Sequence, residues 1–134
     1  MKEITKTEML KEYIVANVAP ILLTGFDLST FKEVEKLEAN CDSSLVNGYY
    51  EETKFLPPTW FLNIKKKENE ALNILLIDKI DKIKKEEQLK FIELLKYRKI
   101  NTFKLPNNCV IILTADAVNS KAIAKEIYSL VAHI

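Results

Sequence analysis

Short apolar runs alternate with stretches of helical periodicity along this chain. A run that is apolar at nearly every position is typical of a parallel strand buried on both faces. The predicted strands are 20–24, 44–49, 73–78 and 109–114, and 131–134 is a candidate for a short fifth strand. The second of these has an alternative, because Asn47-Gly48 within it is also typical of a tight turn.

Helical periodicity fills most of the segments between these runs. Two capping boxes, in which a threonine precedes a glutamate by three residues, predict helices that start after Thr5 and Thr30, the second running to about Glu38. Further helices are predicted from about 58, over 84–99 and from 120, and a short strand over 102–105. Strands that alternate with helices imply right-handed crossovers and helices on both faces of the sheet. We therefore predict one α/β domain over 1–134, a three-layer αβα sandwich with a mostly parallel sheet of four to five strands.

The composition narrows the classes of function. The 134 residues carry a net charge of +1, which gives no general attraction to nucleic acid or to an anionic membrane. Lysines and glutamates are mixed in 65–70 and 82–93, which favours solvated faces over nucleic-acid contacts. The longest apolar run, 18–23, is far too short to cross a bilayer, and 1–5 lacks the apolar core of a signal peptide. We therefore expect a cytoplasmic protein.

Few residues are available for metal, redox or nucleophilic chemistry. The two cysteines, Cys41 and Cys109, form no CxxC pair and are expected to be free thiols in a reducing compartment. The single histidine, His133, lies near the end of the chain without a cluster of other ligands, so neither a metal site nor a catalytic triad is expected.

Polar residues follow three of the predicted strands. Ligands of parallel α/β sheets bind at the carboxyl ends of the strands, although polar residues follow apolar strands in many folds. The candidate site residues at these ends are Thr24, Gly25, Asp78, Asp81, Thr114 and Asp116. Of these, Asp81 is more simply the N-cap of the helix that follows it.

The order of these segments resembles that of MoxR-type AAA+ ATPases. The stretch 74–81 is similar to the Walker B strand of that family, Leu105-Pro106 to the lead into its sensor 1 strand, and 129–134 to its Ser-Arg-Phe-x-His-Ile stretch. The resemblance covers about 18–134 and is densest over 73–116. It implies a P-loop NTPase-like sheet with strand order 1-4-3-2, in which the first and third strands both lie beside the fourth.

The departures from the family pattern fall on the positions that carry its chemistry. The phosphate loop would lie at 25–32, where one glycine remains and Phe31 stands at the lysine position. Lys79 replaces the glutamate that polarises the attacking water, Asp116 replaces the sensor asparagine, and Leu130 replaces the arginine. A phosphate-binding loop needs glycines so that backbone N–H groups can approach the phosphates, and a lysine cannot accept the proton of water at neutral pH without a large pKa shift.

These departures predict a core kept for its shape. We expect a non-catalytic AAA+-like scaffold or protein-interaction module, with no ATP hydrolysis, no cofactor and no lid domain, whose partner is an active AAA+ protein or another copy of this chain. Trp60 and Phe61 are the first candidates for the partner surface, although they would also suit packing over the sheet. The alternatives are a weak Mg-nucleotide-binding regulator that uses Asp78 and Asp116, and a clamp-loader-like accessory subunit in DNA replication.

Overall fold

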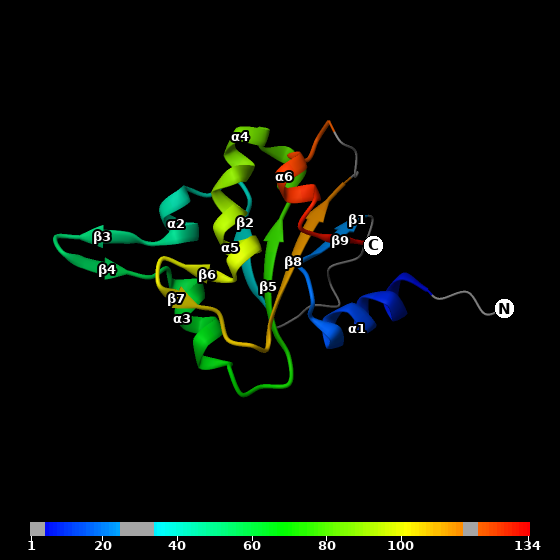
Figure 1. The fold of residues 1–134 in the computed structure, drawn as a ribbon, viewed down its shortest axis with the longest axis horizontal. Helices are drawn as coiled ribbons and strands as arrows, with labels where there is room; N and C mark the ends of the chain where they lie inside the picture. The colour runs from blue at the N-terminus through cyan, green and yellow to red at the C-terminus, as the bar shows by residue number, and fades with distance from the viewer. Residues whose placement is uncertain (1–4, 25–33, 117–120) are drawn as a thin grey trace.

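The computed structural model describes residues 5–24, 34–116 and 121–134. A sheet of five parallel strands runs through the described residues in the order β2-β5-β8-β1-β9 (Figure 1). Its strands are β1 (Ile21–Thr24), β2 (Glu35–Glu38), β5 (Asn73–Asp78), β8 (Cys109–Ala115) and β9 (Ala132–His133). The fold class is therefore α/β with a parallel sheet, as predicted.

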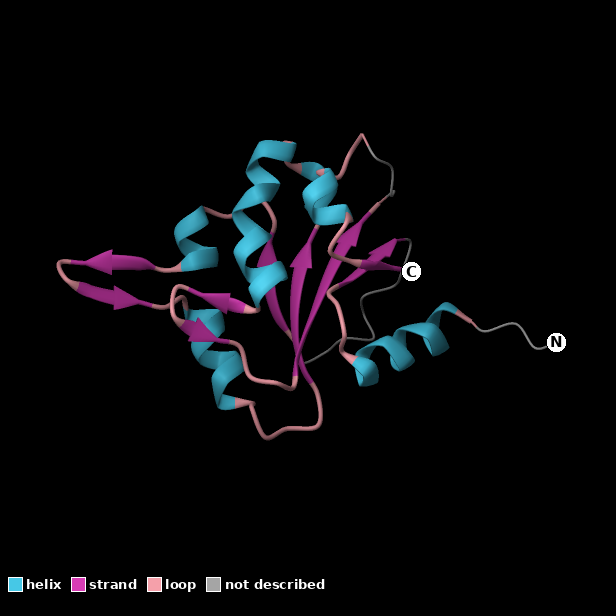
Figure 2. Ribbon diagram, in the orientation of Figure 1, coloured by secondary structure: helices cyan, strands magenta, loops and turns pink. Residues whose placement is uncertain are grey.

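Alternate residues of the inner strands supply two separate apolar clusters. Within β5, Leu75 and Ile77 belong to one cluster, whereas Ile74 and Leu76 belong to the other. This follows from the period of two along a strand, which directs successive side chains to opposite faces. The larger cluster packs against α3 (Thr59–Lys66), α5 (Ile92–Tyr97) and α6 (Lys125–Tyr128), and the smaller one includes Leu10 of α1 (Lys6–Ala16). Figure 2 shows α1 apart from the other helices, and this arrangement is compatible with the predicted three-layer sandwich.

Several predicted elements are confirmed. Thr5 is the N-cap of α1, and its hydroxyl accepts a hydrogen bond of 3.1 Å from the backbone N–H of Glu8. The strands predicted at 73–78 and 109–114 pair in parallel as β5 and β8. The short strand predicted at 131–134 is present as β9 and pairs with β1.

The second predicted strand is wrong. Residues 44–49 form most of α2 (Ser43–Asn47) and then turn at Gly48 into a hairpin of β3 (Tyr49–Glu51) and β4 (Lys54–Leu56). Gly48 has φ +76°, and a Cβ there would lie 2.6 Å from the carbonyl oxygen of Leu56. The alternative reading of Asn47-Gly48 as a tight turn is not met either: Asn47 ends α2 and Gly48 is its C-cap, a position that needs a residue with positive φ, and the turn of the hairpin lies at 52–53.

At one edge of the sheet β2 pairs with β5, in a segment that the sequence predicts to end a helix. Only Leu37 of β2 is buried, and its neighbours Lys36 and Glu38 are exposed. A single buried residue between two exposed ones fits an edge strand. The spacing of three residues between Val34 and Leu37 also fits a helix. The predicted start of that helix, after Thr30, lies outside the described residues.

The helices in the second half are shorter than predicted. The segment predicted over 84–99 is helical as α4 (Lys85–Gln88), a single turn at Leu89–Phe91 and α5, and it ends at Arg98 with φ +55°. A hairpin of β6 (Lys99–Ile100) and β7 (Phe103–Lys104) then leads to β8. Among the described helices, none combines the length and the apolar character needed to cross a membrane.

Candidate functional site

The carboxyl ends of β5 and β8 are joined by a buried hydrogen-bond network. The hydroxyl of Thr114 donates to Oδ1 of Asp78 at 2.6 Å and accepts the backbone N–H of Lys79 at 3.0 Å. The exposed fractions of Asp78 and Thr114 are only 6% and 8%. The network also fixes Lys79, whose backbone lies in the left-handed region with φ +64°. Two of the predicted site residues, Asp78 and Thr114, therefore lie together, but they are bound to each other.

A lysine from the edge strand supplies the positive charge that faces Asp78. Lys36 Nζ lies 3.4 Å from Oδ2 of Asp78 and 3.2 Å from Oε1 of Glu38. The register of β2 and β5 pairs Glu38 with Asp78, which places both carboxylates beside the same ammonium group. The hydrogen bond to Glu38, followed by the charge of Asp78, raises the pKa of Lys36 above its ordinary value. Both oxygens of Asp78 thus have partners within the chain.

The other two carboxylates, Asp81 and Asp116, lie nearer the surface and are linked to each other, although Oδ1 of Asp81 is buried without a hydrogen-bond partner. The backbone N–H of Asp116 donates to Oδ2 of Asp81 at 3.1 Å, and Lys82 Nζ lies 2.7 Å from Oδ2 of Asp116. The hydrogen bond and the charge of Lys82 lower the pKa of Asp116, and the same contact raises the pKa of Lys82. Asp81 is not a helix N-cap, because it lies inside a single helical turn, Ile80–Lys82, and the next helix, α4, is capped at Lys84. Its carboxylate instead binds the end of β8.

Thr24, the next predicted position, is the last residue of β1. The hydroxyl of Thr24 is 3.4 Å from the carbonyl oxygen of Ile134 and 3.5 Å from Nε2 of His133, so it contacts the segment that holds β9. Gly25 and the predicted phosphate-loop segment, 25–32, lie outside the described residues. The described part of the site therefore rests on β5, β8 and β2.

A small hollow opens at this edge of the sheet. Its volume is about 140 Å³, and its lining includes Glu38, Asp78, Lys79 and Lys82. This volume is below the range of about 300–1,000 Å³ that is usual for pockets that hold small ligands. Within 5–24, 34–116 and 121–134, no group of three or more His, Cys, Asp and Glu side chains is placed to hold a metal ion.

Trp60 and Phe61, the predicted partner surface, belong to the core instead. Their exposed fractions are 5% and 4%, and both pack in the larger cluster. The indole N–H of Trp60 donates to the carbonyl oxygen of Leu45 at 2.8 Å, which satisfies its only polar atom. The prediction of a surface at these two residues is therefore wrong, because α3 turns its aromatic side chains toward the sheet.

Two exposed tyrosines lie on the hairpin of β3 and β4, which we call the hairpin arm (residues 49–56). Figure 1 shows the arm projecting from the body of the molecule. Tyr49 and Tyr50 are 54% and 64% exposed, and the ring of Tyr50 lies 5.4 Å from that of Phe55. Phe55 stacks on Phe103 of β7 at 5.5 Å, and the hydroxyl of Tyr50 accepts a hydrogen bond of 2.9 Å from Nδ2 of Asn101. The arm is thus attached to the β6–β7 hairpin at its base.

Sequence reasoning missed both Lys36 and the hairpin arm. No motif marks Lys36, since its role depends on the pairing of β2 with β5. The arm has little local signal, because Asn47-Gly48 ends α2 and its own turn, at 52–53, is Glu52-Thr53. Comparison with known proteins adds no further guide, since no protein-family model and no curated protein matches the chain.

Proposed function

We propose that this protein is a non-hydrolytic AAA+-like scaffold that acts by binding another protein. The observation that carries the proposal is the closed network around Asp78, in which Thr114 and Lys36 already satisfy its carboxylate. A carboxylate that binds a metal ion for phosphoryl transfer must have an oxygen available to that ion. In this chain Lys36 pairs with the oxygen of Asp78 that Thr114 leaves open.

The sheet supports a P-loop NTPase-like assignment of the fold. β1 and β5 lie on either side of β8, which is the arrangement expected for the first, third and fourth strands of that class. β2 then takes the place of the second strand, beside β5. This agreement of order and direction complements the resemblance of 74–81 to a Walker B strand.

The chemistry argues against hydrolysis by this core. Phosphoryl transfer needs cations on the β- and γ-phosphates and a group that orients and deprotonates the attacking water. Lys79 follows Asp78, where an acceptor is expected, and its backbone is held by Thr114. Loss of one such group typically costs orders of magnitude in rate. The alternative of a Mg-nucleotide regulator is also disfavoured, because Asp116 is paired with Lys82. A clamp-loader-like role stays a prediction without a specific observation in its favour.

The hairpin arm is the surface that suits protein binding best. Tyrosines supply large contact area at low cost in conformational entropy and are enriched at protein interfaces. Tyr49 and Tyr50 are exposed on a hairpin whose base is fixed by Phe55, Phe103 and Asn101. A fixed arm binds without the ordering cost that a loose loop would incur.

The proposal is tested by affinity purification from the native cell with matched variants. The unaltered chain and Tyr128→Ala, which changes an exposed tyrosine on α6, should retain the same partner. The double variant Tyr49→Ala/Tyr50→Ala should lose it while its thermal unfolding stays that of a folded protein. Retention of every partner by the folded double variant would contradict the arm as the binding surface.

A further inference from the structure

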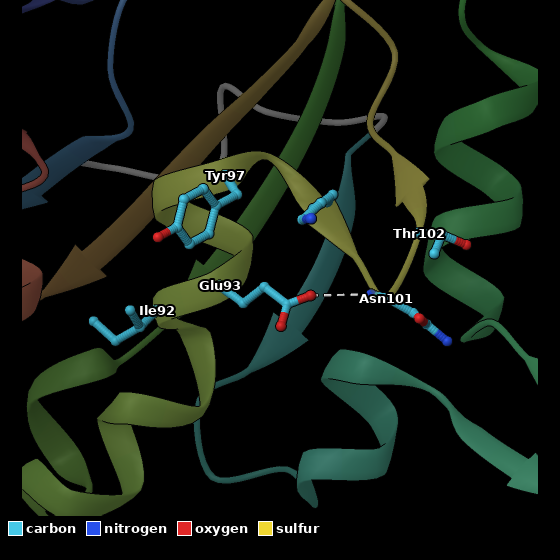
Figure 3. A pocket seen from close by; sticks show the side chains of 6 residues that line it. Ile92, Glu93, Tyr97, Asn101 and Thr102 are labelled. Carbon is cyan, nitrogen blue, oxygen red and sulfur yellow. Dashed lines mark hydrogen bonds between the residues drawn. The ribbon is translucent and has the colours of Figure 1, made fainter.

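A second hollow opens beside the base of the hairpin arm. Its volume is about 520 Å³, and it is lined by Ile92, Glu93, Tyr97, Lys99, Asn101 and Thr102. Figure 3 shows Ile92, Glu93 and Tyr97 on the helical side and Asn101 and Thr102 on the side of the β6–β7 turn. The hydrogen bond between Asn101 and Tyr50 links this wall to the arm, so the two surfaces are continuous.

Tyr97 and Lys99 line the hollow, and Lys96 lies beside the ring of Tyr97. Tyr97 is 58% exposed, and Nζ of Lys96 and of Lys99 lie 5.4 Å and 5.8 Å from the centroid of its ring. Neither lysine forms an ion pair with any residue that the structure describes. The nearby carboxylate, Glu93, accepts the backbone N–H of Asn101 at 3.0 Å (dashed in Figure 3). The lysines are therefore available to an anionic ligand.

Positive charge is concentrated in this part of the chain. Residues 92–104 contain four basic side chains and one acidic one, a net charge of +3, whereas the whole chain has +1. Arg98 is turned inward, where its guanidinium donates to the carbonyl oxygens of Pro106 and Cys109. The rest of this charge comes from Lys96 and Lys104, which are exposed, and from Lys99, which is half-buried. A basic patch of this kind attracts a partner of opposite charge and raises the rate of encounter.

We propose that this hollow binds an acidic segment of the partner protein. In this arrangement an apolar side chain of the segment packs against Ile92 and Tyr97, and its carboxylates pair with Lys96 and Lys99. The inference rests on the proposed function and names the chemistry of the partner. A protein suits the hollow better than a nucleic acid does, because Glu93 lies in the hollow and Glu51 and Glu52 are exposed near the turn of the arm. Separate carboxylates can avoid these charges, whereas a continuous phosphate backbone would be repelled by them.

The test uses three fluorescein-labelled probes and the full chain at low salt. The first is an eight-residue peptide with four aspartates around one leucine and one phenylalanine, the second replaces its aspartates with lysines, and the third is a twenty-nucleotide oligothymidylate. Fluorescence anisotropy should show saturable binding of the acidic peptide. The charge reversal Lys96→Glu/Lys99→Glu should weaken that binding at least tenfold and create binding of the lysine peptide.

A matched control separates this hollow from general attraction to lysines. The variant Lys65→Glu/Lys66→Glu reverses two lysines at the end of α3 and should change binding of the acidic peptide less than twofold. Equal loss in both variants, or no saturable binding of the acidic peptide to the unaltered chain, would overturn the inference. Tighter binding of the oligothymidylate than of the acidic peptide, lost on Tyr97→Ala, would assign the hollow to nucleic acid instead.

The outcome is distinguishable from the fate of the proposed function. If the acidic peptide does not bind but Tyr49→Ala/Tyr50→Ala still releases a co-purified partner, protein binding by the arm stands and only the acidic chemistry is wrong. If the peptide binds and the partner survives loss of both tyrosines, the hollow stands and the arm is wrong.

Discussion

Removal of the Thr114 hydroxyl should destabilise the protein although the hydroxyl is a small group. Thr114→Val keeps the branched shape but removes both a donor to Asp78 at 2.6 Å and an acceptor for the N–H of Lys79 at 3.0 Å. Asp78 is 6% exposed, so water cannot fully replace the lost donor. A hydrogen bond to a charged group contributes about 1.5–3 kcal/mol, and removal of one partner leaves the other desolvated. We expect a loss of about 2–3 kcal/mol in the free energy of unfolding.

Urea unfolding followed by tryptophan fluorescence measures this loss. The single tryptophan, Trp60, is 5% exposed in the core, so its emission reports unfolding of the sheet and helices together. With slopes of about 1–3 kcal/mol per molar urea for small proteins, the midpoint should fall by about 0.7–3 M. Thr114→Ser, which keeps the hydroxyl, is the matched control and should lose less. A loss below about 1 kcal/mol in Thr114→Val, or an equal loss in Thr114→Ser, would refute the reasoning.

Three further predictions concern other sites. Burial raises the pKa of the Cys109 thiol to about 11, so iodoacetamide at pH 8 should modify Cys41 first, and Cys41→Ser should react slowly until it is unfolded; rapid labelling of native Cys41→Ser would contradict this. Gly48→Ala should destabilise by more than about 1 kcal/mol in urea, because a side chain at φ +76° also meets the carbonyl of Leu56; an unchanged midpoint would show that the arm can adjust. The pKa of Lys36 is raised in the folded protein, so its stabilising effect is complete below its ordinary pKa of 10.5 and is lost as pH rises through the higher folded value. Between about pH 10 and that folded pKa, the unaltered chain should therefore lose more stability in thermal unfolding than Lys36→Met does.

The interior strands could be predicted because burial on both faces leaves a local signature. Every residue of β5 and β8 is buried, and the sequence of each is nearly free of charge. An edge strand such as β2 buries one residue in four, and the same pattern also fits a helix. Long-range pairing, which a single sequence does not reveal, decides between the two. The sequence also predicts correctly that Cys41 and Cys109 are free thiols.

The sequence predicts which residues lie at the candidate site but not the contacts between them. Asp78 and Thr114 were expected at one edge of the sheet because parallel strands end together, and they do lie within hydrogen-bond distance. Their contact with Lys36 depends on the register of β2 against β5, which no local pattern specifies. The burial of Trp60 likewise depends on the direction in which α3 faces, since aromatic residues suit both a core and an interface.

The central claim is that the carboxylate of Asp78 serves structure and not ATP hydrolysis. Phosphate release from Mg-ATP by the purified full chain tests it most directly, with Asp78→Asn measured under the same conditions. The account predicts that the unaltered protein releases phosphate no faster than buffer alone, and that Asp78→Asn has the same rate. ATP turnover above that background by the unaltered protein, lost in a folded Asp78→Asn variant, would contradict it.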